Sequence, residues 1–333
     1  MIKMESSSGR ERKEWIDILR AMAIIFVIYG HALNDDGNVY IYYVFTSPIK
    51  IPLFFTISGY LFKSSRGFKE FFTRIFRGLV VPWLCLSILP VLLISIFKGM
   101  AYLQTSVVSI LTGVSVWYMP CCIIGEIIFY LSEKYINKEW VLVLVSLATS
   151  CVGIMLINFG VFNVLMVNRA LEIQMFLCLG YIIKKHQNLF DSVKPQHIII
   201  GTVLYVFIGI ISIVYFPGMN LDVHKGSYYS VPICFSMIII GCTLLFVVGK
   251  NINLHNRLLS YIGKNTLICY IWASYPLLVY EAVIKRLHFS VSNNYLSAGI
   301  KTIIVFVCCC VVSLFVNRFL PEMVGKSRTS GKN

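Results

Sequence analysis

The chain has 333 residues, of which 58% are hydrophobic and only 13% are charged, and its mean hydropathy is +0.78. Soluble domains carry about 25% charged residues, so this composition excludes a soluble globular protein and indicates an integral membrane protein. We interpret the formal net charge of +14 as a topology signal and as attraction to anionic membrane lipids, with no nucleic-acid partner.

Apolar runs of membrane-spanning length follow one another along the whole chain, with no soluble-sized polar segment between them. They predict an all-α fold, a polytopic membrane helical bundle of about ten transmembrane helices. Residues 101–113 are apolar but short, and both a re-entrant segment and an additional span fit them. The ten predicted spans cover residues 15–33, 40–62, 79–97, 114–132, 140–158, 170–183, 197–216, 230–249, 265–283 and 298–320.

The distribution of Lys and Arg orients these spans. With the N-terminus inside, the predicted cytoplasmic loops and tails hold 21 of the 29 Lys and Arg residues. This excess follows the positive-inside rule and predicts that both the N- and C-termini are cytoplasmic. The beginning of the chain has no small-residue cleavage site of the kind that ends a signal peptide. We therefore expect a cytoplasmic tail at 1–14, a membrane domain at 15–320 and a second cytoplasmic tail at 321–333.

The 11 cysteines lie mostly inside the predicted spans, as in the Cys121-Cys122 pair and the run from Cys308 to Cys310. No CxxC motif and no Cys/His spacing typical of a metal site occurs. We interpret the cysteines as small apolar helix residues, and we predict no metal site.

The first predicted span carries Asp17, Arg20 and His31. A charge at the centre of a membrane helix costs about 2.5 to 3.5 kcal/mol, so a helix that only anchored the chain would not normally retain these residues. Arg20 and His31 are eleven residues apart, which places them within about 20° of one helix face but about 16 Å apart along the axis, so they can face one cavity from its two ends. The alternative is a local Asp17–Arg20 ion pair, with His31 simply at the membrane interface. Asp35, in the following NDDG sequence, either orients the imidazole or belongs to a turn.

The second predicted span contains Pro48 and Pro52 with Lys50 between them. Prolines remove backbone hydrogen bonds, and a lysine at membrane depth needs a polar or anionic partner. We therefore expect this span to be broken around something polar. Ser58 is either an alternative nucleophile or, with Gly59, a small-residue packing device.

Further ionisable residues follow. Arg74 and Arg77 are three residues apart on one helical face at the predicted cytoplasmic edge, where two guanidinium groups suit the bidentate binding of phosphates. An ordinary positive-inside loop is the alternative for this pair. Glu126 lies inside the fourth predicted span, and Arg169 and Glu172 are three residues apart in the sixth. For these three we weigh a supporting or substrate-binding role against mutual pairing or helix packing.

The ordered set of motifs in this chain resembles acyltransferase family 3, the bacterial ten-helix membrane O-acyltransferases that modify cell-surface sugars. It is most similar to the branch of polysaccharide and fucose O-acetylases. The resemblance is strongest over residues 14–83 and weak after about residue 190. It rests on the segments EWIDILRAMAIIFVIYGHA, IPLFFTISGYLFK, RIFRGLVVPW, VWYMPCCIIGEIIFYL and FLCLGYIIKK.

The resemblance implies roles for particular residues. The essential Arg and His of the family's first helix correspond to Arg20 and His31, and its Arg-x-x-Arg motif corresponds to Arg74 and Arg77. The family pattern near the ninth span often includes a His where this chain has Ser274, in GKNTLICYIWASYPLL. We therefore assign no catalytic role at that position.

The resemblance also implies a reaction. Acetyl-CoA, or another acyl-CoA, is the expected donor on the cytoplasmic side, with its phosphates on Arg74, Arg77 and Arg20. The expected acceptor is a hydroxyl of a surface polysaccharide or a lipid-linked oligosaccharide, and the expected location is the bacterial cytoplasmic (inner) membrane. The unperturbed pKa of a histidine, about 6.5, suits a base for a sugar hydroxyl. His31 either deprotonates the acceptor for direct attack on the thioester or carries the acyl group itself.

Two other classes of function are compatible with part of the sequence. A membrane transporter or flippase for a lipid-linked sugar or a small anion would also have broken spans and buried charges. The hydropathy, however, shows no inverted internal repeat, and the ordered motifs favour the enzyme. A structural partner of a polysaccharide synthase would not need the buried charges.

Overall fold

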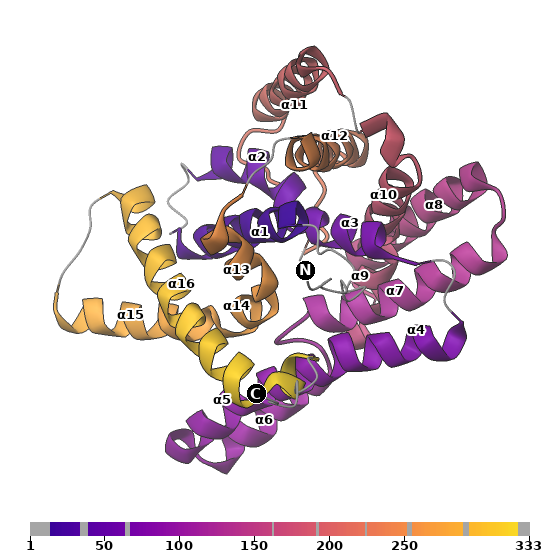
Figure 1. Ribbon diagram of the computed structural model, residues 1–333. Coiled ribbons are helices and arrows are strands. Elements are labelled where there is room, and N and C mark those ends of the chain that lie inside the picture. The colour runs from indigo at the N-terminus through magenta and orange to yellow at the C-terminus, as the bar shows by residue number, and fades with distance from the viewer. Residues whose placement is uncertain are drawn as a thin grey trace, which may run out of the picture.

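The computed structural model describes residues 14–33, 39–63, 67–161, 163–190, 193–223, 225–251, 255–288 and 293–325. These residues form helices without a β-strand, as Figure 1 shows. The first eight α-helices are α1 (Glu14–Ala32), α2 (Tyr40–Lys50), α3 (Pro52–Leu61), α4 (Phe68–Ile75), α5 (Val81–Lys98), α6 (Met100–Leu111), α7 (Tyr118–Tyr135) and α8 (Glu139–Asn158). The other eight are α9 (Val167–Glu172), α10 (Gln174–Lys185), α11 (Pro195–Tyr215), α12 (Val231–Asn251), α13 (Arg257–Lys264), α14 (Thr266–Trp272), α15 (Ser274–Arg286) and α16 (Asn294–Phe319).

The all-α membrane architecture is confirmed. Seven helical segments of the described chain are long and apolar enough to cross a membrane, and two bent helix pairs raise this number to nine. The bent pairs are α9 with α10, at 50°, and α14 with α15, at 44°. The seven segments are Glu14–Ala32, Tyr40–Leu61, Phe68–Lys98, Glu139–Asn158, Pro195–Tyr215, Val231–Asn251 and Asn294–Phe319.

Helix α7 overlaps the fourth predicted span, 114–132, which is not among the seven segments and two bent pairs. It has 18 residues, but Glu126, Glu133 and Lys134 make it more polar than the others. Helix α6, which covers most of residues 101–113, has 12 residues. Its length of about 18 Å is shorter than the ~30 Å hydrocarbon core, and this favours the re-entrant interpretation. The total of ten spans and the cytoplasmic chain ends stay predictions.

The second span is interrupted where the prolines predict it. Helix α2 ends at Lys50, Ile51 lies between the two helices, and Pro52 begins α3. Because proline has no N–H, Pro52 fits the first turn of a helix but cannot continue the hydrogen-bond ladder of α2.

Glycines allow pairs of helices to pack with their backbones in direct contact. A Cβ atom added at Gly180 of α10 would lie 1.8 Å from the Thr56 carbonyl oxygen of α3, and one at Gly263 of α13 would lie 1.7 Å from the Asp17 carbonyl oxygen of α1. Small residues at such crossings are typical of membrane helix packing, since apolar side chains gain little by leaving lipid. In Figure 1, α1 is central, with α13 and α16 on one side and α3 on the other.

Candidate active site

The C-terminal end of α1 carries His31, whose side chain is exposed. Two tyrosines of α2 fix this end of the helix. The Tyr42 hydroxyl donates a hydrogen bond of 2.7 Å to the Phe26 carbonyl, and the Tyr43 hydroxyl donates one of 2.9 Å to the Gly30 carbonyl. The turn that presents His31 is therefore held against α2.

Lys301 of α16 holds the same turn from the other side. Its ammonium donates to the Ala32 carbonyl at 3.4 Å and lies 3.7 Å from the Glu281 carboxylate of α15. The Lys301 side chain is only 7% exposed. A cation at a helix C-terminus complements the helix dipole and the unpaired last carbonyls. Sequence reasoning missed this residue, although a lysine inside the apolar run GIKTIIVF was a signal for a buried partner.

The other end of α1 carries the predicted local ion pair. The Arg20 guanidinium lies 3.6 Å from the Asp17 carboxylate, with Asp17 buried and Arg20 27% exposed. Arg20 also lies near Tyr118 of α7, close enough for its charge to act on the phenol. Arg20 and His31 belong to one uninterrupted helix, so the axial separation of about 16 Å applies.

Helix α7 presents a polar stripe to this region. Tyr118, Cys122 and Glu126 follow one another at intervals of four residues, so they lie along one face over about 12 Å. The Tyr118 hydroxyl contacts the Cys122 thiol. The Cys122 sulfur lies 3.9 Å from the Glu126 carboxylate and 3.9 Å from the hydroxyl of Ser58 in α3. Ser58, for which the sequence allows either a nucleophilic or a packing role, therefore faces the stripe.

Glu126, at the end of the stripe, forms an ion pair with Arg74 of α4. The Glu126 side chain is 5% exposed and that of Arg74 is 32% exposed. The pairing explains how a carboxylate is accommodated inside an apolar helix. Neither α4 nor α7 reveals it, because the two residues are 52 positions apart in the sequence.

Arg77 follows in a π-helical turn, η1 (Phe76–Val80), between α4 and α5. Pro82 at the start of α5 has no N–H for the Gly78 carbonyl, which accounts for a change in the hydrogen-bond ladder here. The Arg77 side chain is exposed, whereas Arg74 turns toward the bundle. Both nevertheless line one hollow.

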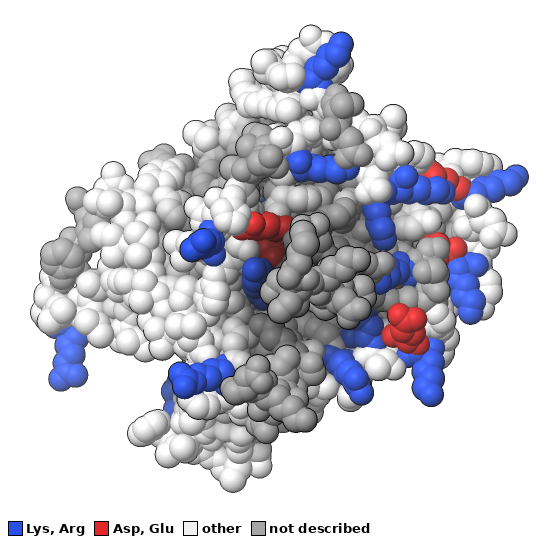
Figure 2. Space-filling model, in the orientation of Figure 1, with Lys and Arg blue, Asp and Glu red and all other residues white. Residues whose placement is uncertain are grey.

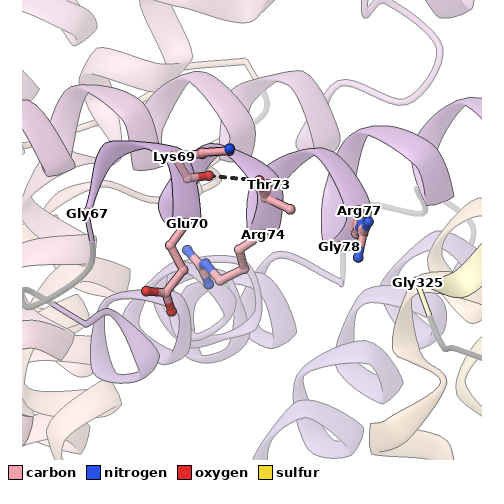
Figure 3. A pocket seen from close by; sticks show the side chains of 8 residues that line it. All are labelled: Gly67, Lys69, Glu70, Thr73, Arg74, Arg77, Gly78 and Gly325. Carbon is pink, nitrogen blue, oxygen red and sulfur yellow. Dashed lines mark hydrogen bonds between the residues drawn. The ribbon is translucent and has the colours of Figure 1, made fainter.

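This basic hollow is open, has a volume of about 730 Å³ and is shown in Figure 3. Its three cations, Lys69, Arg74 and Arg77, exceed the carboxylate of Glu70 in the lining and that of Glu126, which pairs with Arg74. It lies on a part of the surface where Figure 2 shows basic side chains gathered around α4, α8 and α10. Polyphosphate groups are the ligands that such a concave cationic site suits.

The C-terminal segment completes the basic hollow. After α16, the 3₁₀ turn η4 (Pro321–Val324) packs against α5, and Gly325 lines the hollow. A Cβ atom at Gly325 would lie 2.6 Å from the Arg77 carbonyl oxygen. The first residues of the predicted C-terminal tail therefore pack against the arginine turn, which the sequence did not indicate.

Lys50 lies near the His31 end of α1. Its ammonium is 4.7 Å from the centre of the Tyr43 ring and 3.6 Å from the position that a Cβ of Gly30 would occupy. This contact is a cation–π interaction on a half-buried side chain. Asp35 lies outside the described residues.

Arg169 and Glu172 form a separate buried cluster. The Arg169 guanidinium lies 3.4 Å from the Glu172 carboxylate and donates to the Val223 carbonyl at 2.8 Å. The Tyr228 hydroxyl donates to the other Glu172 oxygen, and burial raises the pKa of the Tyr228 phenol well above its usual value. This network ties the loop between α11 and α12 to α9, which agrees with the mutual-pairing interpretation.

Comparison with known proteins identifies the family. A family model described as an acyltransferase domain matches residues 13–317, nearly the whole chain. No curated protein and no solved structure gives a match. Because the family match runs from the start of α1 almost to the end of α16, it includes the His31 turn, the α7 stripe and every residue that lines the basic hollow except Gly325. The chain belongs to acyltransferase family 3 and is a membrane acyltransferase.

Proposed function

We propose that the protein is an acyl-CoA-dependent O-acyltransferase of the bacterial cytoplasmic membrane. It moves an acyl group, acetyl by resemblance to its family, from cytoplasmic acyl-CoA to a hydroxyl of a cell-surface polysaccharide or a lipid-linked sugar. His31 acts on the acceptor, and Arg20, Arg74 and Arg77 bind the donor. The observation that carries this proposal is the basic hollow at Arg74 and Arg77, continued inward by the polar stripe of α7.

Support for the donor site comes from charge and access. Acyl-CoA is a polyanion with a long, thin thioester-bearing arm. The exposed Arg77 and Lys69 suit its phosphates at the open rim of the hollow, and Arg74 stands at the inner side beside Glu126. Each charge-assisted hydrogen bond contributes about 1.5 to 3 kcal/mol.

In this proposal the thioester-bearing arm of the donor follows the polar stripe of α7 inward. From Glu126 the stripe leads through Cys122 to Tyr118, where Arg20 lies nearby. Arg20 marks the beginning of the α1 face whose other end carries His31. In this proposal the donor arm continues past Arg20 along this face and brings its thioester to His31, where the acceptor hydroxyl also arrives.

The chemistry at His31 is a proton transfer. An unprotonated imidazole nitrogen takes the proton of the acceptor hydroxyl as its oxygen attacks the thioester carbonyl. The carbon–sulfur bond breaks, and the coenzyme A thiolate leaves and takes up a proton. The ester remains on the sugar. The turn held by Tyr42, Tyr43 and Lys301 keeps the imidazole in place for this step.

The test uses membrane vesicles of defined orientation with radiolabelled acetyl-CoA. Inside-out vesicles expose the cytoplasmic surface, so they should incorporate label into polysaccharide or lipid-linked sugar. Intact right-side-out vesicles should do so only after the acetyl-CoA is loaded inside. Movement of a lipid-linked sugar across the membrane without any ester formation would instead support the transporter and contradict the proposal.

A further inference from the structure

A second hollow, of about 390 Å³, lies between α5, α6 and the break that separates α14 from α15. We call it the hydroxyl pocket. Its walls carry hydroxyl groups on all three sides, from Ser87 of α5, Ser106 and Ser109 of α6, and Ser274 at the beginning of α15. None of the described residues that line it is charged.

The hydroxyls of α6 are placed by helical periodicity. Tyr102, Thr105, Ser106 and Ser109 stand at intervals that bring them to one face of this short helix, and all four line the hydroxyl pocket. Apart from Gln104, the opposite side of α6 is apolar, and Val108 on the outer side of the helix is 59% exposed. An apolar helix with one hydroxylated face turned to a hollow is suited to hold something polar there.

Ser87 gives an independent indication of a ligand. The residue is 3% exposed, and its Oγ is buried without a hydrogen-bond partner in the described part of the chain. A buried hydroxyl without a partner is unfavourable by about 1 to 3 kcal/mol. Because Ser87 lines the pocket, its hydroxyl is available to a bound molecule.

The chemistry of the walls selects the class of ligand. Hydroxyls donate and accept hydrogen bonds, so they suit a ligand that does both. An ionised ligand would be buried without a countercharge, which is costly, and an acyl chain would leave the Ser87 hydroxyl unpaired. Tyr102 and Tyr275 add aromatic rings with an apolar face and a polar tip. The apolar face and hydroxyl rim of an uncharged sugar ring match this combination.

The hydroxyl pocket also lies next to the proposed reaction path. Its wall residues Val116 and Ile271 are close in sequence to Tyr118 and Tyr270, respectively. The rings of these two tyrosines are 5.3 Å apart, and the Tyr270 hydroxyl accepts a hydrogen bond of 3.2 Å from the Tyr118 N–H. Val116 and Ile271 pack in one apolar cluster with Tyr118 and Tyr270, so the wall of the pocket and the Tyr118 end of the stripe share a cluster of side chains.

We infer that the hydroxyl pocket binds an uncharged sugar ring. As a site that holds a sugar ring of the acceptor away from the hydroxyl that reacts at His31, it deepens the proposed function and rests on it, but the binding itself is measurable without acyl transfer. The binding measurement uses the full chain in lipid nanodiscs without acyl-CoA. The probes are methyl β-D-galactoside and methyl α-L-fucoside, followed by saturation-transfer NMR, with glucuronate as the charged comparison.

The variants fill or trim the hydroxyl pocket. Ser109→Phe places a ring in the hollow and should reduce the affinity for the neutral probes at least about tenfold, which corresponds to about 1.4 kcal/mol. Its matched control is Val108→Phe, one residue away on the exposed side, which should leave the affinity unchanged. Ser87→Ala removes one hydroxyl without adding volume, and it should weaken binding about two- to tenfold. Because alanine suits a buried helix position, this variant tests the inference even if Ser109→Phe fails to fold.

The outcomes separate the two proposals. The inference that the pocket binds a sugar is supported if the neutral probes bind the unmodified protein and lose affinity only in the pocket variants. This holds even if acyl transfer is later disproved. Probes that do not bind, that bind equally to all variants, or that bind no better than glucuronate overturn the pocket and indicate a hollow that holds only water. Acyl transfer measured alongside would still support the proposed function in that case.

Discussion

Arg74 has two possible partners for its charge, because its guanidinium pairs with Glu126 and also lines the basic hollow. If the donor phosphates use Arg74, they compete with Glu126 for it. We therefore predict that Glu126→Gln strengthens acyl-CoA binding while it destabilises the protein, and that Arg74→Gln weakens both. A purely structural ion pair would not produce a variant, such as Glu126→Gln, that binds acyl-CoA more tightly and is less stable.

The magnitudes follow from the burial of the two side chains. Removal of a charge-assisted hydrogen bond costs about 1.5 to 3 kcal/mol, and the lower end applies here since Arg74 is 32% exposed and is partly screened by water. Loss of one such contact to the donor, at about 1.5 kcal/mol, corresponds to about a tenfold increase in Kd for Arg74→Gln. The gain for Glu126→Gln should be smaller, because the freed guanidinium regains water as well as phosphate.

The measurements are the binding of acetyl-CoA by isothermal titration calorimetry and the thermal unfolding of the protein in detergent. Arg77→Gln is the matched control, since Arg77 lines the same hollow but is exposed. It should weaken acetyl-CoA binding with little change in thermal stability. Unchanged affinity in both Arg74→Gln and Glu126→Gln would refute the donor site and leave the pair a structural one.

Three further predictions follow from the packing and the charges. Lys301→Met removes the hydrogen bond to the Ala32 carbonyl, so the rate of acyl transfer should fall at least tenfold while the affinity for acetyl-CoA stays constant. Lys301→Arg should restore part of the activity. An equal loss of affinity for acetyl-CoA in Lys301→Met would contradict this prediction. Gly180→Ala forces a methyl group to within 1.8 Å of the Thr56 carbonyl and should destabilise the protein by about 1 to 3 kcal/mol. Gly299→Ala in α16 meets open space and should stabilise it by about 0.5 to 1 kcal/mol; similar thermal shifts for the two glycines would show that the α3–α10 contact is not close. For topology, reporters after Asn333 and in the loop at 63–78 should read cytoplasmic and one near Asp36 external, whereas an external C-terminus would mean that residues 101–113 span the membrane.

The sequence predicts features that depend on local spacing. Hydropathy locates the helices, and the i, i+3 pairs Asp17–Arg20 and Arg169–Glu172 form as their spacing allows. Pro52 likewise begins a helix where the second span is interrupted. These features need only the geometry of one helix, so a single segment contains the information.

Contacts between distant segments could not be read in this way. The Arg74–Glu126 pair and the bond from Lys301 to the α1 carbonyl join positions 52 and 269 residues apart, respectively. They depend on how helices are packed, which no single segment specifies. The bends at Ile173 and Ala273, in the sixth and ninth predicted spans, were also missed, because hydropathy locates a helix in the sequence but does not give the direction of its axis.

The most direct test of the central claim is the rate of acetyl transfer by His31→Ala in inside-out vesicles. The matched control is His197→Ala, which alters another exposed histidine, in the first turn of α11. We expect the His31 variant to insert normally, bind acetyl-CoA normally and lose about 10² to 10⁴ in rate, as expected when a general base is removed. His31→Gln should be nearly as inactive, since an amide cannot take up the proton. Wild-type transfer rates in a correctly inserted His31→Ala protein would contradict the account.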